Sequence, residues 1–199
     1  MARNTGTRER LLEAAIDAIE TDGEAGVRVD VVADAAGVAK PSIYHFFGDR
    51  EGLVVAALGE RYRRSLDIAI ETSIALAESF TERDQYIQMI RRNILSFGSA
   101  DGVRRRRERI QVMGSAATRP DLQAEVDRVN DLVTVRLAEL LELGRRRGWT
   151  TTPHDSETLA RWWLGLMNGR RLVDERGDEP GAAWDQVTID AITRLLFGS

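Results

Sequence analysis

A short stretch of this 199-residue chain gathers polar side chains that can donate hydrogen bonds, namely Lys40, Ser42, Tyr44 and His45. An ammonium, two hydroxyls and an imidazole can bond phosphate oxygens or the edges of nucleic-acid bases. Pro41 lies among them and fits the first turn of a helix, where its missing N–H costs little. We therefore expect a helix that begins near Lys40 and presents these groups beside N–H groups that face anions.

Groups that could support catalysis or bind a metal ion are scarce. The chain has no cysteine, and His45 and His154 are its only histidines. Without thiols there is no thiolate zinc site and no cysteine nucleophile. His154 and Asp155 adjoin Pro153, and no nucleophile–base pair accompanies them. The sequence therefore predicts a protein that is not an enzyme and needs neither a metal nor a cofactor.

Three helices are expected in the first fifty residues to position the polar cluster. The first runs between Thr7, which suits an N-cap, and Gly23, which suits a helix end. The second begins at Val31 and ends at Gly37, and the third covers about 40–47. Small residues and a glycine between two short helices are typical of a helix-turn-helix.

Beyond residue 49 the apolar residues recur at helical spacing, and no segment alternates as a strand would. The sequence predicts an all-α fold of about nine helices, short ones first and long ones after. We expect an N-terminal three-helix helix-turn-helix domain over 5–65 and a larger C-terminal helical domain over 66–199.

The overall charge does not favour binding to a polyanion, because the formal net charge is −4. The N-terminal residues are locally basic, however, which leaves room for phosphate contacts. No apolar run approaches the ~20 residues that span a bilayer, and the N-terminus lacks a secretory signal. We expect a cytoplasmic protein with no membrane partner.

Residues 31–53 resemble the signature of the TetR family of bacterial transcriptional regulators. Its elements are Ala35-Ala36-Gly37-Val38, the pair Tyr44 and Phe47, and Arg50-Glu51-Gly52-Leu53. The resemblance spans about residues 5–65, and the C-terminal part is similar only in length and helical pattern.

The resemblance implies a DNA-binding site on the third helix. It assigns five residues to the exposed face of the recognition helix: Lys40, Pro41, Ser42, Tyr44 and His45. It assigns phosphate contacts to three arginines: Arg50, Arg28 and Arg8. Phe47 and Leu53 are expected in the core, where they fix the angle of that helix.

Large, adaptable side chains on the later helices suggest a ligand pocket, although packing of a core explains them equally well. The candidates are Tyr86, Met89, Phe97, Met113, Trp162, Trp163 and Met167. The resemblance implies an effector pocket here, and an apolar lining would favour a hydrophobic or aromatic small molecule.

A dimer interface is expected in the same half of the chain, because the family forms homodimers through a four-helix seam. Gly165 and Gly169 lie one turn apart and permit close helix contact. The other candidates are Leu172, Val173, Trp184 and Ile192.

The run from Arg104 to Arg109 holds five arginines and one glutamate. Three interpretations stay open. The run forms a solvated helix face, it contacts acidic residues of the N-terminal domain such as Glu13, Asp17 and Glu20, or it binds an anionic ligand.

The resemblance thus implies a ligand-responsive DNA-binding regulator. It would act as a homodimeric repressor on a near-palindromic operator in double-stranded DNA, and a small-molecule effector would release it. The alternative is a helical small-molecule-binding or scaffold protein that does not contact DNA.

Overall fold

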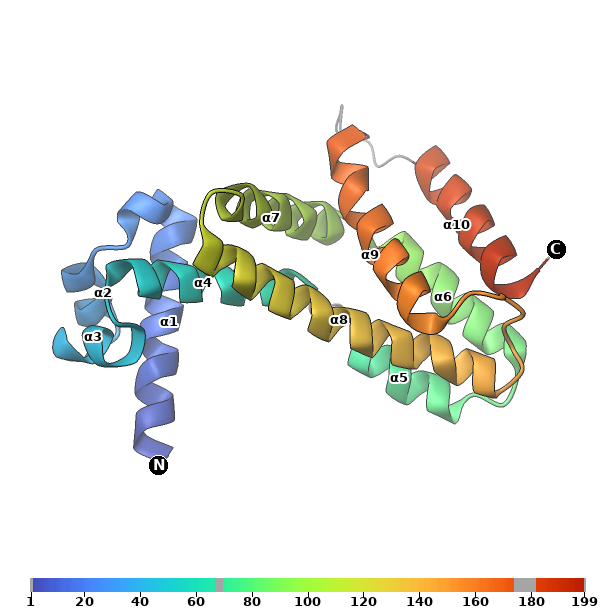
Figure 1. Cartoon of the computed structure of the whole chain (residues 1–199), viewed down its shortest axis with the longest axis horizontal. Helices are drawn as coiled ribbons and strands as arrows, with labels where there is room; N and C mark the ends of the chain where they lie inside the picture. The colour runs from blue at the N-terminus through green and yellow to red at the C-terminus, as the bar shows by residue number, and fades with distance from the viewer. Residues whose placement is uncertain (1, 67–69, 174–181, 199) are drawn as a thin grey trace. The chain divides into compact units, whose positions relative to one another are not determined.

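The computed structural model describes residues 2–66, 70–173 and 182–198, with the side chains of 2–5, 171–173 and 182 left aside. Within these ranges the chain is helical and contains no strand. The elements, shown in Figure 1, are α1 (Ala2–Asp22), a 3-10 turn η1 (Glu24–Gly26), α2 (Val29–Ala35), α3 (Pro41–Phe47), α4 (Arg50–Leu66), α5 (Ile70–Ser79), α6 (Arg83–Ser96), α7 (Ala100–Ala116), α8 (Pro120–Arg146), α9 (Ser156–Val173) and α10 (Ala182–Phe197). The all-α fold expected from the sequence is confirmed. The helix α5 is the one that the apolar spacing did not predict as a separate element.

Backbone packing divides the chain into two compact units. Unit 1 comprises Met1–Arg64 and Val112–Asp127, and unit 2 comprises Ser65–Gln111 and Arg128–Ser199. Unit 1 therefore includes residues 112–127 as well as the N-terminal helices. No local pattern in the sequence indicated that this later segment would pack with them, because the contact joins residues far apart along the chain.

The core of unit 1 joins α1, α2, α3 and α4. Leu11 and Ala15 of α1, Ile43 of α3 and Leu53 of α4 are each 0% exposed. Leu53 therefore lies in the core, as expected, whereas Phe47 is only half-buried. The burial of Ile43 fixes which face of the short helix α3 points outward.

The turn between α2 and α3 depends on Gly37, whose φ of 63° lies in the left-handed region. The Gly37 N–H donates to the Asp34 carbonyl at 3.1 Å, and the Val38 N–H donates to the Ala33 carbonyl at 3.0 Å. This pair of bonds is the Schellman motif, which satisfies the last carbonyls of a helix and ends it sharply. The expected end of the second helix at Gly37 is confirmed.

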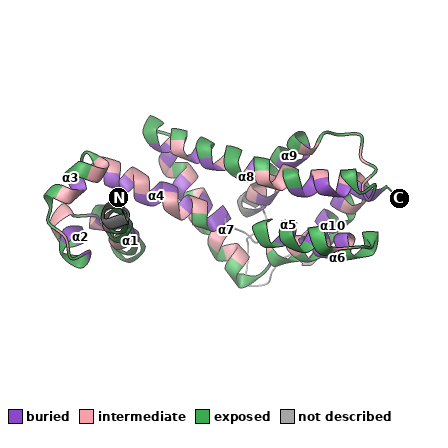
Figure 2. Ribbon diagram, turned by 90° about the horizontal axis from the view of Figure 1, so that it is seen from below, coloured by how far each residue is buried: buried purple, intermediate pink, exposed green. Residues whose placement is uncertain are grey.

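The core of unit 2 contains residues from α5, α6, α8, α9 and α10. Alternation of buried and exposed residues along α8 follows the turns of the helix, as Figure 2 shows. Arg83 at the start of α6 donates to the carbonyls of Trp149 and Phe197, each at 2.9 Å. Its guanidinium carbon also lies 5.4 Å from the centre of the Phe197 ring. One side chain therefore fastens the start of α6 to two distant parts of the chain.

Candidate functional site

The α3 surface, which we define as residues 40–45 with Ile43 excluded, carries the polar cluster found in the sequence. Tyr44 is 55% exposed. Lys40, Pro41 and His45 are also exposed, and Ser42 is half-buried. Ile43 is the buried residue of α3, and the exposed residues Pro41, Tyr44 and His45 lie on its outer side. The structure thus brings all five residues expected on this helix to one exposed element.

Both ends of α3 are fixed by local chemistry. Pro41 occupies the first turn, where its locked φ suits a helix. Gly48 ends the helix with a φ of 82°, and its N–H donates to the Tyr44 carbonyl at 3.0 Å. Asp49 then accepts the Gly52 N–H at 2.8 Å and caps α4. The side chains of α3 are therefore held on a rigid support rather than on a loop.

The three arginines expected to bind phosphate all contact the protein itself. Arg50 donates to the carbonyls of Val27 at 2.7 Å and Glu24 at 2.6 Å. Arg28 pairs with Asp30 at 3.0 Å. The guanidinium carbon of Arg8 lies 5.4 Å from the centre of the Phe47 ring. Arg50 therefore has a structural role that the sequence pattern did not indicate: it ties the start of α4 to η1. Phosphate binding by these arginines stays a prediction.

A polar cluster within unit 1, which sequence reasoning missed, joins the segment 112–127 to the N-terminal helices. Arg119 donates to the Glu24 carboxylate at 2.7 Å and also pairs with Glu51. Ser115 donates to the other Glu24 oxygen at 2.5 Å. Glu24 and Arg119 are 95 residues apart, so no local pattern could have revealed this contact.

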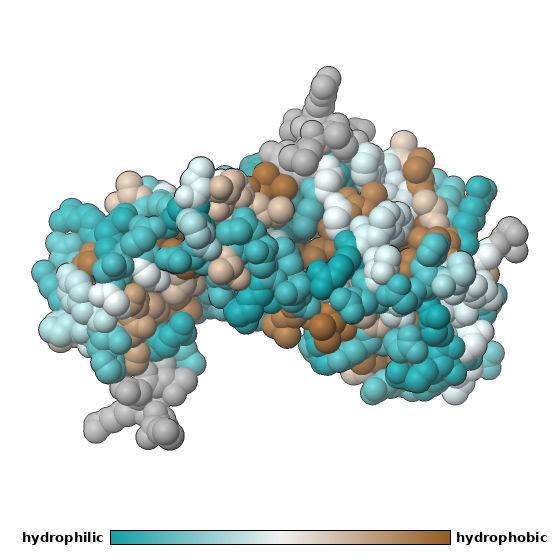
Figure 3. Space-filling view, viewed as in Figure 1, coloured by the Kyte–Doolittle hydropathy of each residue, from teal (hydrophilic) through white to brown (hydrophobic). Residues whose placement is uncertain are grey.

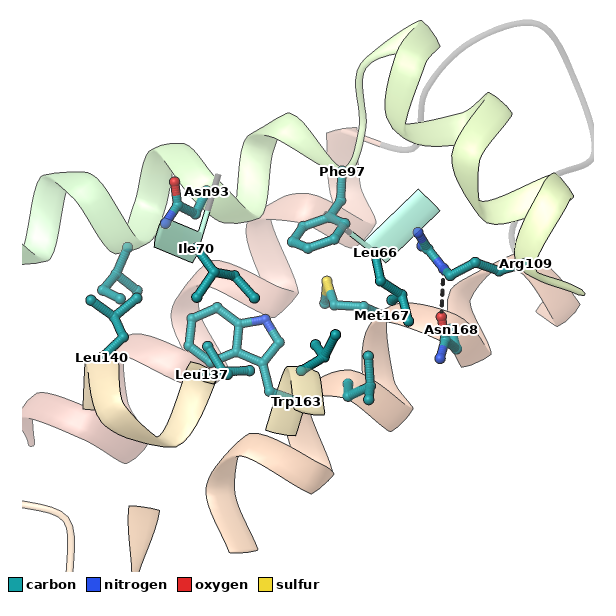
Figure 4. Close-up of a pocket in the computed structure, with 13 residues that line it drawn as sticks. Leu66, Ile70, Asn93, Phe97, Arg109, Leu137, Leu140, Trp163, Met167 and Asn168 are labelled. Atoms are coloured by element: carbon teal, nitrogen blue, oxygen red, sulfur yellow. Dashed lines mark hydrogen bonds between the residues drawn. The ribbon is translucent and has the colours of Figure 1, made fainter. Parts of the chain in front are cut away.

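A second feature is an apolar pocket within unit 2. Three of the expected pocket residues line it: Phe97, Trp163 and Met167. Seven aliphatic side chains complete the apolar wall: Leu66, Ile70, Ile90, Val133, Leu137, Leu140 and Leu164. Three polar side chains that the sequence did not single out for a pocket also line it: Asn93, Arg109 and Asn168. Figure 4 shows Trp163 in the middle of the pocket, with Asn93 and Arg109 toward opposite ends.

Four other expected pocket residues do not line this pocket. Tyr86 and Met89 are 0% and 2% exposed and belong to the core of unit 2. The Tyr86 hydroxyl donates to the Leu140 carbonyl at 3.0 Å, and burial raises the pKa of this phenol. Trp162 is 44% exposed. Met113 belongs to unit 1, where it is half-buried.

The physical reason is the direction in which each side chain points from its helix. Trp162 and Trp163 are successive residues, about 100° apart around α9, so only one of them can face the interior. Tyr86 and Met89 lie on the face of α6 that packs into the core of unit 2. Apolar character and helical spacing therefore identified buried residues such as Tyr86 and Met89 but could not separate a pocket wall from a core.

The arginine run divides between the surface and the interior. Arg104 has 62% of its side chain exposed and pairs with Asp101 and Glu108, each at 3.0 Å. Arg106 and Arg109 are each only 1% exposed. Arg109 donates through Nε to the Asn168 amide oxygen at 2.9 Å and through a terminal nitrogen to the Ser65 carbonyl at 2.7 Å. The interpretation of the whole run as a solvated face is wrong, since only part of it is solvated.

The expected dimer residues lie in different environments. A Cβ added to Gly165 or Gly169 would meet no atom within 4 Å, so both glycines border open space. Ile192 is 1% exposed and packs in the core of unit 2, and Trp184 is half-buried. Leu172 and Val173 have side chains outside the described set. A dimer seam at these residues stays a prediction, but Ile192 is not available for one.

Large apolar side chains are exposed elsewhere in unit 2, where Figure 3 shows hydrophobic side chains on the visible face. The exposed large apolar side chains of unit 2 include Leu132 and Val135 of α8, Trp162 of α9 and Val187 of α10, which are between 44% and 68% exposed. Trp162, Gly165 and Gly169 are spaced at i, i+3 and i+7, which places them on one side of α9.

Two features are absent from the part of the chain that the structure describes. No group of three His, Cys, Asp or Glu side chains in it could hold a metal ion. None of the helices traced in the described ranges is long and apolar enough to cross a membrane.

The order of the first helices and the turn at Gly37 define a helix-turn-helix protein. Residues 11–57 match the family model of the bacterial regulatory proteins of the TetR family. The HTH-type transcriptional regulator RutR of Escherichia coli K12 is 33% identical over 86 residues. That match covers 39% of this chain and 39% of RutR, so the chain spans about two fifths of this curated relative.

Solved structures share the fold over almost the whole chain. A Rhodococcus sp. protein classed as a TetR-family transcriptional regulator has a TM-score of 0.69 and 23% identity, covering 96% of this chain and 99% of that one. A protein from Mesorhizobium loti, classed in the same way, has a TM-score of 0.72 and 19% identity, covering 98% of each chain. Both structures are less than 25% identical to this chain, so they show a shared fold, and the match to the TetR family itself covers residues 11–57.

Proposed function

We propose that this chain is a DNA-binding transcriptional regulator in which α3 is the recognition helix. One observation carries the proposal: the outer side of α3, with Tyr44 55% exposed, lies inside the segment that matches the TetR family model. Side chains at the start of such a helix can reach base edges, while its backbone N–H groups face phosphates. Lys40 and His45 flank Tyr44 and add donors to the same side.

The proposed regulator binds DNA as a homodimer and represses transcription. Two recognition helices that enter successive major grooves are about 34–36 Å apart, so the operator would be a near-palindrome. The exposed apolar side chains of α8, α9 and α10 favour association of two copies, because exposed apolar patches mark contact surfaces. Such a regulator would act in the cytoplasm, where the DNA is.

The pocket of unit 2 is the proposed effector site. Its wall is mostly apolar, with a few polar groups at its ends, which is the usual composition of a small-molecule site. An effector that binds better to a form of the dimer with misplaced recognition helices must weaken DNA binding by the same factor. Release from the operator is the proposed response.

The two histidines of the chain offer a matched test of α3. His45 is exposed on α3, and His154 is exposed in unit 2 between α8 and α9. We expect His45→Ala to weaken binding to the DNA upstream of the protein's own gene by roughly three- to tenfold, the loss of one polar contact. His154→Ala should bind as tightly as the unaltered protein. Fluorescence anisotropy with labelled duplexes measures both.

The competing function is a small-molecule-binding or scaffold protein that does not contact DNA. It would gain support if none of the palindromic duplexes shifted in mobility at low salt, or if Lys40→Ala and Tyr44→Ala left DNA affinity unchanged. The unfolding temperatures of these variants must match that of the unaltered protein, since both substitutions lie on an exposed surface.

A further inference from the structure

The guanidinium and the amides that line the unit 2 pocket are already bonded to the protein. Arg109 is 1% exposed, and it donates to the Asn168 amide oxygen at 2.9 Å and to the Ser65 carbonyl at 2.7 Å. The Asn93 amide nitrogen donates to the Ser73 hydroxyl at 3.1 Å. These bonds join the helices around the pocket, and a ligand that used the same atoms would first have to break them.

Trp163 differs from these residues, because no acceptor for its indole N–H is found in the part of the chain that the structure describes. The residue lines the pocket and is 5% exposed. Figure 4 shows its ring nitrogen on the edge of the indole that is turned toward Phe97 and Met167. A phenyl ring and a thioether are at best weak hydrogen-bond acceptors. The pocket therefore contains a nearly buried donor without a partner.

A donor in this position makes the chemistry of a ligand matter. The N–H of a buried tryptophan usually has an acceptor, and a donor left without one costs the free energy of its desolvation. The Tyr86 hydroxyl, in the core of unit 2, does have such a partner in the Leu140 carbonyl at 3.0 Å. A molecule that brings an acceptor to the Trp163 N–H would remove this cost, whereas a molecule without one would seal the donor from water.

We infer that the unit 2 pocket takes an uncharged, mostly apolar molecule with a hydrogen-bond acceptor, such as a ketone or an ester, whose oxygen accepts from the Trp163 N–H. The hydrocarbon body of the molecule would lie against aliphatic side chains of the wall, among them Ile70 and Leu137. An ion is disfavoured, because burying a charge against such a wall is costly. The inference rests on the proposed role of the pocket as the effector site, and it narrows the ligand from any hydrophobic molecule to a neutral acceptor.

The test compares pairs of ligands that have the same shape and differ in the acceptor. Acetophenone is compared with α-methylstyrene, and cyclohexanone with methylenecyclohexane, because each alkene has a methylene carbon in place of the carbonyl oxygen. Calorimetry on the full chain without DNA gives the ratio of ketone affinity to alkene affinity. For at least one pair, we expect this ratio to be about fivefold or more higher in the unaltered protein than in Trp163→Phe, which lacks the donor.

Comparison of the two ratios removes the difference in hydrophobicity between ketone and alkene, since that difference is the same for both proteins. Equal ratios in the unaltered protein and in Trp163→Phe, for both pairs, overturn the inference. The absence of binding by both ketones also overturns it.

The indole N–H signals of the ¹⁵N-labelled protein provide a second readout, and the chain has only four tryptophans. The Trp163 signal, assigned through its own backbone resonances, should move downfield with a ketone and much less with the matching alkene. A role in packing alone would give the same response to both ligands, and that result overturns the inference. This spectrum needs no substitution in the pocket, so it decides the question if Trp163→Phe does not fold.

Trp184 supplies the control variant. Its Nε1 is also buried without a partner in the described chain, but the residue does not line the pocket. Trp184→Phe should therefore keep the ketone-to-alkene ratio of the unaltered protein. If the ratio fell there as far as in Trp163→Phe, the assignment of the acceptor to the Trp163 N–H would be overturned.

The readout separates this inference from the proposed function. Calorimetry and spectra without DNA report on the pocket, whereas the His45→Ala comparison reports on α3. A protein that selects the ketones through Trp163 but ignores DNA would refute the regulator and leave the ligand class standing. A protein that binds its operator but does not distinguish ketone from alkene would do the reverse.

Discussion

The α3 surface and the unit 2 pocket place their polar groups in opposite surroundings. On α3, Lys40, Tyr44 and His45 are exposed and keep their water until a partner displaces it. In the pocket, Arg109 is 1% exposed and already bonded to Asn168 and Ser65. Exposed groups suit a large partner that is bound through many weak, screened contacts. A buried guanidinium that is already bonded to the protein instead holds the helices around a pocket in place. The difference implies that DNA affinity and ligand affinity respond differently to the same perturbations.

Salt concentration should change the affinities of the two sites most differently. Raising NaCl from about 50 to about 200 mM should weaken operator binding on the order of a hundredfold or more, because each neutralised phosphate releases counterions. The affinity of the pocket for an uncharged apolar ligand should change by less than about threefold, since salt screens charges and not apolar contacts. Anisotropy and calorimetry in the same buffers measure the two. Equal salt dependence at both sites would contradict the comparison.

Two adjacent residues of α3 should affect different properties: Ile43 the stability of the fold, and Tyr44 the binding of DNA. Ile43→Ala removes a side chain that is 0% exposed and should lower the free energy of unfolding by about 2–5 kcal/mol. Tyr44→Ala removes one that is 55% exposed and should cost less than about 0.5 kcal/mol while weakening DNA binding. Urea unfolding and anisotropy provide the measurements. A large loss of stability in Tyr44→Ala would mean that α3 is buried in solution by some other contact.

A carboxylate in unit 1 shows what a partly buried ion pair adds to stability. Hydrogen bonds from Arg63 and then Arg64, each at 2.8 Å, hold the pKa of Glu60 at about 2 although burial opposes them. In the unfolded chain this carboxyl has its ordinary pKa of 4.5. Between these two values the unfolded state binds more protons, so stability is present above pH 4.5 and is lost as the pH falls toward 2.

Glu60→Gln should therefore lower the free energy of unfolding at pH 7 by about 1–2 kcal/mol, after allowance for solvent screening. Toward pH 2 the difference from the unaltered protein should vanish. The control is Glu9→Gln, on the exposed side of α1, which should show no such pH-dependent difference. Urea unfolding at a series of pH values measures this difference. If the free energy of unfolding had the same pH dependence in both variants, the stabilisation would not come from the lowered pKa of Glu60.

The α3 surface could be predicted from the sequence because its determinants are local. Its polar groups lie within six residues, the helix before it ends at a single glycine, and Pro41 and Asp49 mark the next two starts. The turn at Gly37 and the cap at Asp49 act through hydrogen bonds to residues a few positions away, and Pro41 acts through its fixed φ. The resemblance to the family then implied that this surface binds DNA.

The pocket could not be predicted in the same way, because its wall comes from helices between α4 and α9. Arg109 and Asn168 are 59 residues apart, and nothing local links an arginine on one helix to an amide on another. The spacing of the arginines along α7 does carry a signal. Arg106 and Arg109 are spaced i and i+3, so they share a helix face, and Arg104 does not lie on it. Helical spacing applied to the charged residues, and not only to the apolar ones, separates the buried arginines Arg106 and Arg109 from the solvated Arg104.

That separation makes Arg104 the residue whose loss should change least. Its side chain is 62% exposed, and its partners Asp101 and Glu108 lie on the same helix at i−3 and i+4. Exposed pairs of this kind contribute little, because water screens them and two long side chains lose freedom. Arg104→Gln should therefore leave the urea midpoint within experimental error, whereas Arg109→Met, at a side chain that is 1% exposed, should lower it. If Arg104→Gln instead lowered the urea midpoint as much as Arg109→Met, burial would not be what distinguishes the two arginines.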